Sequence, residues 1–102
     1  MDEPSSPRNY VFDLPAEADY LDALKYYEDE GGLGAAFEAE IRAGIALILE
    51  HPEAWPVVTI EGARKKVLAK FPYNIYYSVE PGLVRIRAVA HQSRRPGYWM
   101  NR

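Results

Sequence analysis

The chain has 102 residues and a mass of 11.6 kDa, which predicts one domain with a single hydrophobic core. It contains no cysteine, so a disulfide framework, a thiolate metal site and a cysteine nucleophile are excluded. The net charge of −3 is the sum of two halves of opposite charge. Residues 1–53 contain 13 acidic and three basic side chains, whereas residues 54–102 contain two acidic and nine basic ones. This segregation of charge indicates a charged partner.

The start of the chain predicts a flexible arm, because residues 1–8 contain two prolines, two serines and no apolar residue after Met1. A secretory signal needs a positive start and an apolar stretch, which this opening lacks. The longest apolar run, residues 43–49, is far shorter than a membrane-spanning helix. We therefore expect no membrane association and a cytoplasmic protein.

Helical spacing dominates the first half of the chain, after a short β-prone run at residues 10–12. A first helix is predicted to begin near Pro15, because proline lacks the N–H group that has no partner in a first helical turn. Apolar residues recur three or four positions apart up to Tyr27, and the glycines within residues 31–34 end this helix. A second helix is predicted over residues 33–50, with an apolar stripe of Phe37, Ile41, Ile45, Ile48 and Leu49.

The link between the two predicted helices is short and rich in glycine, so the helices should fold back as an antiparallel hairpin. Pro52 ends the second helix, and His51 beside it is expected to have a structural role at the helix end. Gly44 lies within the second helix, where glycine costs about 1 kcal/mol relative to alanine. This glycine predicts the close approach of another backbone.

In the second half, apolar and polar residues alternate with a period of two, which is typical of strands. Strands are predicted over residues 64–71, 74–79 and 84–88. A tight turn at residues 80–82 joins the last two, because proline presets its first corner and glycine takes the positive φ of the second. In the last strand, one face is expected to hold Val84, Ile86 and Ala88, and the other Arg85 and Arg87.

The predicted fold class is α+β. An N-terminal strand, a helical hairpin and a three-stranded antiparallel meander form one mostly antiparallel sheet, with the helices on one face. The other face then carries arginines and stays open. The whole chain, residues 1–102, forms one domain.

Basic and aromatic side chains are interleaved in the second half. Cations among aromatic rings can hold phosphate and stack on bases, which suits single-stranded nucleic acid, while the alternative is a solvated sheet face without a ligand. The separation of charge along the chain favours a binding face. Its candidate binding residues are Arg64, Lys66, Lys70, Arg85, Arg87, Arg95 and Trp99.

His91 has two interpretations. It lies at the end of a predicted strand, shortly before Arg94. There it could act as a general base, or donate a hydrogen bond to a phosphate, near neutral pH. A histidine at a strand end also commonly fixes local hydrogen bonds. No histidines and carboxylates have the spacing of metal ligands, and no glycine-rich loop resembles a phosphate-binding loop, so we expect no metal and no cofactor. No serine lies in the sequence context of a nucleophile elbow.

Two segments, KFPYNIYY at residues 70–77 and VRIRAVAHQSRRPGYW at residues 84–99, resemble the RelE/ParE family of toxins from bacterial type II toxin–antitoxin (plasmid stabilisation) systems. The resemblance extends over almost the whole chain, including residues 18–28 and 51–52 of the helical hairpin and its end. It implies a compact toxin that is wrapped and neutralised by a segment of its cognate antitoxin. RelE-type members cut mRNA in the ribosomal A site, whereas ParE-type members poison DNA gyrase.

The resemblance implies a role for five positions of the RelE-type ribonuclease set. Two positions keep the residue type of the RelE-type pattern: Lys65 matches a catalytic lysine and Tyr98 matches the C-terminal tyrosine. Two others differ, because this chain has Val67 where the pattern has a second lysine and Asn74 where it has an arginine. A further arginine position falls on Gln92. Cutting a phosphodiester without a metal needs charge stabilisation, which Val67 and Asn74 do not supply. The His-x-x-Arg-x-Pro tail is also more typical of the ParE-like branch.

We therefore expect a ParE-like toxin that inhibits DNA gyrase by binding, without catalytic residues of its own, and whose basic half binds an acidic antitoxin segment. One alternative is a metal-independent endonuclease that cuts mRNA on the ribosome. Another is a non-toxic module that only binds the antitoxin. The catalytic candidates under the ribonuclease alternative are Lys65, Arg94, Tyr98 and His91, with Lys66 next to the first.

Overall fold

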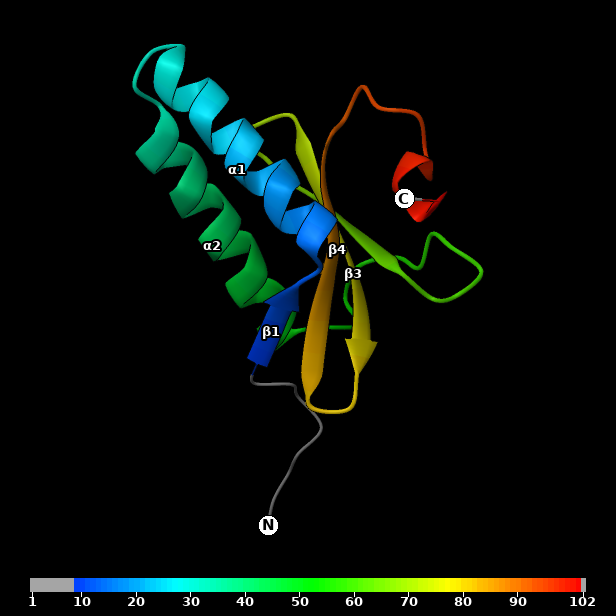
Figure 1. Ribbon diagram of the computed structural model, residues 1–102. Helices are drawn as coiled ribbons and strands as arrows, with labels where there is room; N and C mark the ends of the chain where they lie inside the picture. Colours follow the sequence, from blue (N-terminus) through cyan, green and yellow to red (C-terminus); the bar gives the residue numbers. More distant parts are fainter. Residues whose placement is uncertain (1–8, 102) are drawn as a thin grey trace.

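The computed structural model describes residues 9–101, which form a four-stranded sheet, two long helices and a short 3-10 helix (Figure 1). The predicted arm at residues 1–8 lies outside the described residues. The elements in chain order are β1 (Asn9–Phe12), α1 (Leu14–Asp29), α2 (Gly34–Glu50), β2 (Arg64–Val67), β3 (Tyr73–Glu80), β4 (Leu83–His91) and the 3-10 helix η1 (Tyr98–Asn101).

The strands lie in the order β1-β4-β3-β2. β1 runs parallel to β4, and the other neighbours are antiparallel. The hairpin of α1 and α2 covers one face of this sheet, while η1 lies on its other side (Figure 1). The predicted α+β fold, with a mostly antiparallel sheet and helices on one face, is confirmed.

Both helices begin and end close to the predicted positions. α1 has Pro15 in its first turn, and Gly31 and Gly32 after its end have φ of 139° and 69°, values that glycine adopts readily. α2 ends at Glu50, and the N–H of His51 donates to the carbonyl of Leu47 at 2.9 Å. His51 therefore lies at the end of the helix, as predicted.

The main core lies between the helical hairpin and the sheet. Phe37, Ile41, Ile45 and Ile48 of α2 are at most 4% exposed, as the predicted apolar stripe requires. Burial of such a stripe against a sheet is the chief source of stability for helices of this length. The sheet side of this core consists of Ile75, Tyr77, Val84, Ile86 and Val89.

Gly44 lies against side chains and not, as predicted, against another backbone. A Cβ atom at this position would lie 3.2 Å from Cδ1 of Ile75 and 3.2 Å from Cδ2 of Leu68. These contacts are tighter than ordinary van der Waals distances, so glycine lets α2 pass directly over two core side chains.

Replacing Gly44 with valine is expected to lower the free energy of unfolding by about 1–3 kcal/mol, because the larger side chain must displace Ile75 and Leu68. Ala46→Val is the matched control, since Ala46 lies on the exposed side of the same helix. Urea denaturation measures both variants. An equal loss in the two would show that a β-branched residue in the helix, and not the contact, lowers the stability.

β2 ends at Val67, four residues earlier than the predicted strand of residues 64–71. The reason is a carboxylate of α2, because Oε2 of Glu40 accepts hydrogen bonds from the backbone N–H groups of Ala69 and Lys70, both at 3.1 Å. These two amides pair with the helix instead of extending the strand.

A β-bulge changes which residues of β4 face the helices. Tyr76 pairs with Ala88 but Tyr77 pairs with Ile86, so Arg87 is an extra residue in the ladder. Ala88 was predicted on the same face as Ile86, and this is wrong: after the bulge Val89 joins the main core, whereas Ala88 belongs to a second cluster. The face opposite the helices is therefore partly covered, and not an open arginine face.

Tyr77 joins the sheet to the segment that follows α2. Its side chain is fully buried, and its hydroxyl donates a hydrogen bond of 2.7 Å to the carbonyl of Pro52. Burial raises the pKa of this hydroxyl from 10.0 to about 12. The folded state thus holds the proton more tightly than the unfolded state, so this stabilising contribution is complete below pH 10 and is lost as the pH rises to 12.

Tyr77→Phe is expected to lower the free energy of unfolding by about 1 kcal/mol at neutral pH, because the Pro52 carbonyl loses its donor. The variant should also lose less stability than the wild type between pH 10 and 12. Denaturant unfolding at several pH values tests both, with the exposed Tyr26→Phe as control. Identical pH profiles for wild type and Tyr77→Phe would contradict the assignment.

Candidate functional site

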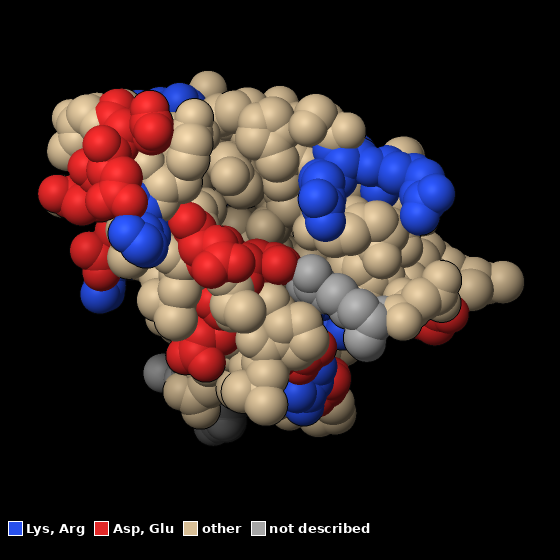
Figure 2. Space-filling view, turned by 45° about the horizontal axis from the view of Figure 1, so that its top comes forward, with Lys and Arg blue, Asp and Glu red and all other residues tan. Residues whose placement is uncertain are grey.

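The acidic and the basic side chains of the chain lie mainly on different sides of the molecule. Figure 2 shows many acidic side chains over the helical side and a group of Lys and Arg side chains on the opposite side. The two basic residues of the hairpin are already paired, since Lys25 contacts Asp29 at 2.7 Å and Arg42 contacts Glu38 at 3.0 Å. The helical side is therefore acidic at its surface.

Two of the predicted binding arginines belong to an ion-pair network. Arg85 contacts Glu80 at 2.8 Å and Asp13 at 3.1 Å, and Arg87 contacts Asp13 at 3.0 Å. The hydrogen bond from Arg85 lowers the pKa of Glu80. Asp13 immediately precedes α1, so these pairs join the start of the helix to β4.

Two further basic residues hold the segment between α2 and β2. Arg64 donates to the carbonyls of Glu53 and Trp55, at 3.2 and 2.7 Å. The ammonium of Lys66 lies 4.6 Å from the centre of the Trp55 ring, a cation–π contact. Both side chains are thus engaged within the fold.

Three of the predicted basic residues, Lys65, Lys70 and Arg95, make no side-chain hydrogen bond or ion pair with another residue of the described part of the chain. Lys70 and Arg95 are exposed, and Lys65 is half-buried. These side chains are the ones most readily available to an external partner.

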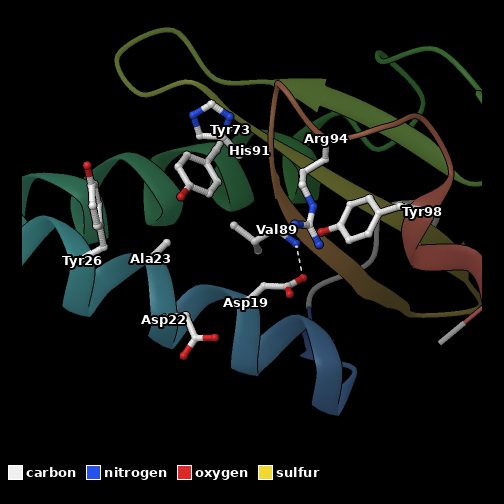
Figure 3. Close-up of a pocket in the computed structure, with 9 residues that line it drawn as sticks. All are labelled: Asp19, Asp22, Ala23, Tyr26, Tyr73, Val89, His91, Arg94 and Tyr98. Carbon is white, nitrogen blue, oxygen red and sulfur yellow. Dashed lines mark hydrogen bonds between the residues drawn. The ribbon is translucent and has the colours of Figure 1, made fainter.

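A cleft of about 330 Å³ lies between α1 and the segment after β4 (Figure 3). It brings together His91, Arg94 and Tyr98, three of the predicted catalytic candidates. The guanidinium of Arg94 lies 4.3 Å from the centre of the Tyr98 ring. Nδ1 of His91 accepts a hydrogen bond from the N–H of Ser93 at 3.0 Å, the local role that was one of its two interpretations.

The same cleft contains residues that the sequence interpretation did not select. α1 contributes Asp19, Asp22, Ala23 and Tyr26 to its lining, and Figure 3 shows the Asp19 side chain directed toward Val89. Their spacing of three, four and seven residues is the signal of one helical face. Asp19 also accepts a hydrogen bond from the N–H of Val89 at 3.1 Å, which ties α1 to β4.

A second cleft, of about 290 Å³, lies on the face of the sheet opposite the helices. It contains Lys65, Tyr76 and Trp99. Trp99 is only 5% exposed, and its ring centre lies 5.1 Å from that of Tyr76 and 5.4 Å from the guanidinium of Arg87.

The positions of the ribonuclease pattern do not all line one cleft. Lys65 lines the second cleft, whereas Tyr98 lines the first. Asn74 is 7% exposed and pairs with Val67, which lies on the edge strand. No group of three or more metal-binding side chains occurs within residues 9–101, and none of the helices in that range is long and apolar enough to cross a membrane.

Comparison with known proteins identifies the family. A family profile described as "ParE toxin of type II toxin-antitoxin system, parDE" matches residues 10–96. The chain therefore belongs to the ParE toxin family of type II toxin–antitoxin systems, as its second half predicted. No curated protein matched the sequence.

A solved structure supports the fold. The chain is similar to a protein of the "Chromosomal ParDE TA system from P. aeruginosa", with a TM-score of 0.70 and 17% sequence identity. The similarity covers 84% of this chain and 96% of that one. At this identity the likeness shows a shared fold.

Proposed function

We propose that this toxin stops growth by inhibiting DNA gyrase, and that its cognate antitoxin neutralises it by binding the basic side of the sheet. The observation that carries the proposal is the separation of Lys65 from Arg94, Tyr98 and His91, which line a different cleft. General acid–base cleavage of RNA requires such groups to converge on one phosphate. A toxin that acts by binding has no such requirement.

The side chain of Trp99 supports the same proposal. It is packed over Ala88 and Ala90, on the sheet face to which Lys65 and Asn74 also belong. An RNA strand laid across this face would meet a buried indole instead of a row of cations. This arrangement disfavours cleavage by the ribonuclease pattern.

The antitoxin part of the proposal rests on charge. Lys65, Lys70 and Arg95 have neither an ion pair nor a side-chain hydrogen bond with another of residues 9–101. An acidic antitoxin segment would complement them and be steered to this side. The acidic helical hairpin would not attract such a segment.

Purified toxin, gyrase and supercoiled plasmid test the proposal directly. We expect trapped, cleaved DNA that increases with toxin concentration and disappears when the antitoxin from the neighbouring reading frame is added. Arg94→Ala and Tyr98→Phe should leave this activity intact. The absence of cleaved DNA at excess toxin would refute gyrase as the target.

One observation favours a second candidate, cleavage of mRNA on the ribosome. His91, Arg94 and Tyr98 do share a cleft, so an acid, a base and a phosphate-binding group could act there in another arrangement. Toeprinting on translating ribosomes would then show cuts in the A site, and Tyr98→Phe would abolish them.

If expression without the antitoxin does not arrest growth, the chain is instead a non-toxic binding module.

A further inference from the structure

Two loops lie side by side at one end of the sheet. Residues 68–72 join β2 to β3, and residues 92–97 follow β4, both at the top of the sheet in Figure 1. The N–H of Gln92 donates to the carbonyl of Pro72 at 2.8 Å, so a backbone hydrogen bond links the two loops. The second loop is exposed from Gln92 to Pro96. This end of the sheet is therefore an accessible surface made by two connected loops.

Each loop presents one cation to the solvent. Lys70 and Arg95 are exposed, and neither makes an ion pair or a side-chain hydrogen bond with another of residues 9–101. Their backbones are held in place, because the N–H of Lys70 donates to Oε2 of Glu40 at 3.1 Å and the carbonyl of Arg95 accepts from the N–H of Tyr98 at 3.2 Å. Tyr98 in turn packs against the second core cluster. Two available charges thus project from a fixed backbone.

The acidic side chains near these loops have other partners. From residue 62 onward the sequence contains one acidic residue, Glu80, which lies at the opposite end of β3 in an ion pair. The carboxylate of Glu40 accepts two backbone hydrogen bonds from the first loop. Asp19 and Asp22 line the cleft into which the Arg94 side chain points (Figure 3). The charges of Lys70 and Arg95 are therefore not neutralised within the described chain.

The side chains of the two loops suit a phosphate backbone better than a protein surface. Neither loop, both of which the structure describes in full, exposes a large apolar side chain. The centre of a protein–protein interface is depleted in charge and rich in aromatic groups, whereas phosphate oxygens are contacted mainly by Arg, Lys and hydroxyl side chains. Exposed Ser93 adds a hydroxyl to Lys70 and Arg95. These donors fit phosphates without an apolar anchor.

We propose that Lys70 and Arg95 contact the phosphate backbone of the DNA that gyrase holds, so that the toxin recognises the gyrase–DNA complex. This inference rests on the proposed inhibition of gyrase. The contacts are independent of base sequence, because phosphates carry no sequence information. They also give a physical reason for neutralisation, since an acidic antitoxin segment and DNA compete for the same two cations. The acidic helical hairpin faces away from the DNA, because like charges repel.

Removal of the two charges tests the contact. With Lys70→Gln and Arg95→Gln together, about 10-fold more toxin should be needed to trap cleaved plasmid DNA with gyrase at about 50 mM salt. Two phosphate contacts give a slope of about −1.8 in log affinity against log salt, so this difference should shrink about 10-fold as the salt rises to about 200 mM. Lys25→Gln combined with Arg42→Gln is the matched control, because it removes two charges from the helical hairpin and should behave as the wild type.

Surface plasmon resonance on immobilised, DNA-free gyrase shows whether the two cations contact DNA or the enzyme. The wild-type toxin and the Lys70 and Arg95 variant should bind this surface equally, because the lost contacts are to DNA. The same loss of affinity on gyrase with and without DNA would overturn the inference, since the cations would then contact the protein. Equal trapping of cleaved DNA by the two toxins would overturn it as well.

Chromatography on immobilised duplex DNA needs no gyrase, so it separates failure of this inference from failure of the proposed function. The wild-type toxin and the hairpin control should elute at higher salt than the Lys70 and Arg95 variant. Elution of all three at the same salt overturns the phosphate contact, whether or not the toxin traps cleaved DNA. If the wild-type toxin binds the column through these cations but traps no cleaved DNA with gyrase, the phosphate contact stands and gyrase is refuted as the target.

Discussion

Replacing Phe37 with alanine is expected to lower the free energy of unfolding by about 3–5 kcal/mol. The Phe37 side chain is fully buried at the point where α2 meets α1 and the sheet. Its ring lies between 5.1 and 6.1 Å from four other aromatic rings, those of Tyr20, Tyr27, Phe71 and Tyr73. The substitution removes all four contacts and leaves a cavity that rigid neighbours cannot fill.

Thermal or urea unfolding followed by circular dichroism measures this loss. Phe12→Ala is the control, because Phe12 lies at the edge of the same cluster and is only half-buried. Its loss should be clearly smaller. Since a domain of this size has a total stability of about 5–15 kcal/mol, Phe37→Ala should be partly unfolded at growth temperature. Equal losses in the two variants would mean that Phe37 is not the centre of the core.

The helical hairpin could be predicted because its signals are local. Pro15 at the start of α1 and Gly31 and Gly32 after its end act through their own φ values and their own hydrogen-bonding groups. The stripe from Phe37 to Ile48 reflects a single buried face. None of these features depends on what the distant part of the chain does.

The sheet was predicted less well because its details depend on distant residues. The end of β2 is set by Glu40, which lies 29 residues before Ala69 in sequence. The bulge at Arg87 shifts the alternation of β4 by one residue, and only the pairing with Tyr76 and Tyr77 determines it. An alternating pattern shows that two faces exist, but not where the phase changes.

Which basic residues can bind a partner also depends on residues that are distant in sequence. Arg85 and Arg87 were predicted as binding residues, yet both contact Asp13, 72 and 74 residues away in sequence. A count of basic residues does not show which of them are paired inside the fold. Similarly, Ala88 and Ala90 have no feature in the sequence that separates them from other strand residues, and only the fold shows that they pack with Trp99 in a second hydrophobic cluster.

Lys65→Glu combined with Lys70→Glu is expected to weaken antitoxin binding about 10–100-fold, mainly through slower association. Neither lysine has an ion-pair partner within the described chain, so the substitutions should change the surface potential without breaking the fold. Reversing two charges replaces attraction of an acidic segment by repulsion. The effect should shrink as salt is added, because ions screen exposed charges beyond about 8–10 Å at physiological ionic strength.

The matched control is Lys25→Glu combined with Arg42→Glu, which makes the same change in net charge on the helical hairpin. Association rates at low and high salt, measured by surface plasmon resonance, separate the two double variants. If the basic side of the sheet is the antitoxin surface, only the Lys65 and Lys70 variant associates slowly at low salt. Equal slowing in both would mean that the antitoxin responds to the net charge of the toxin and not to this surface.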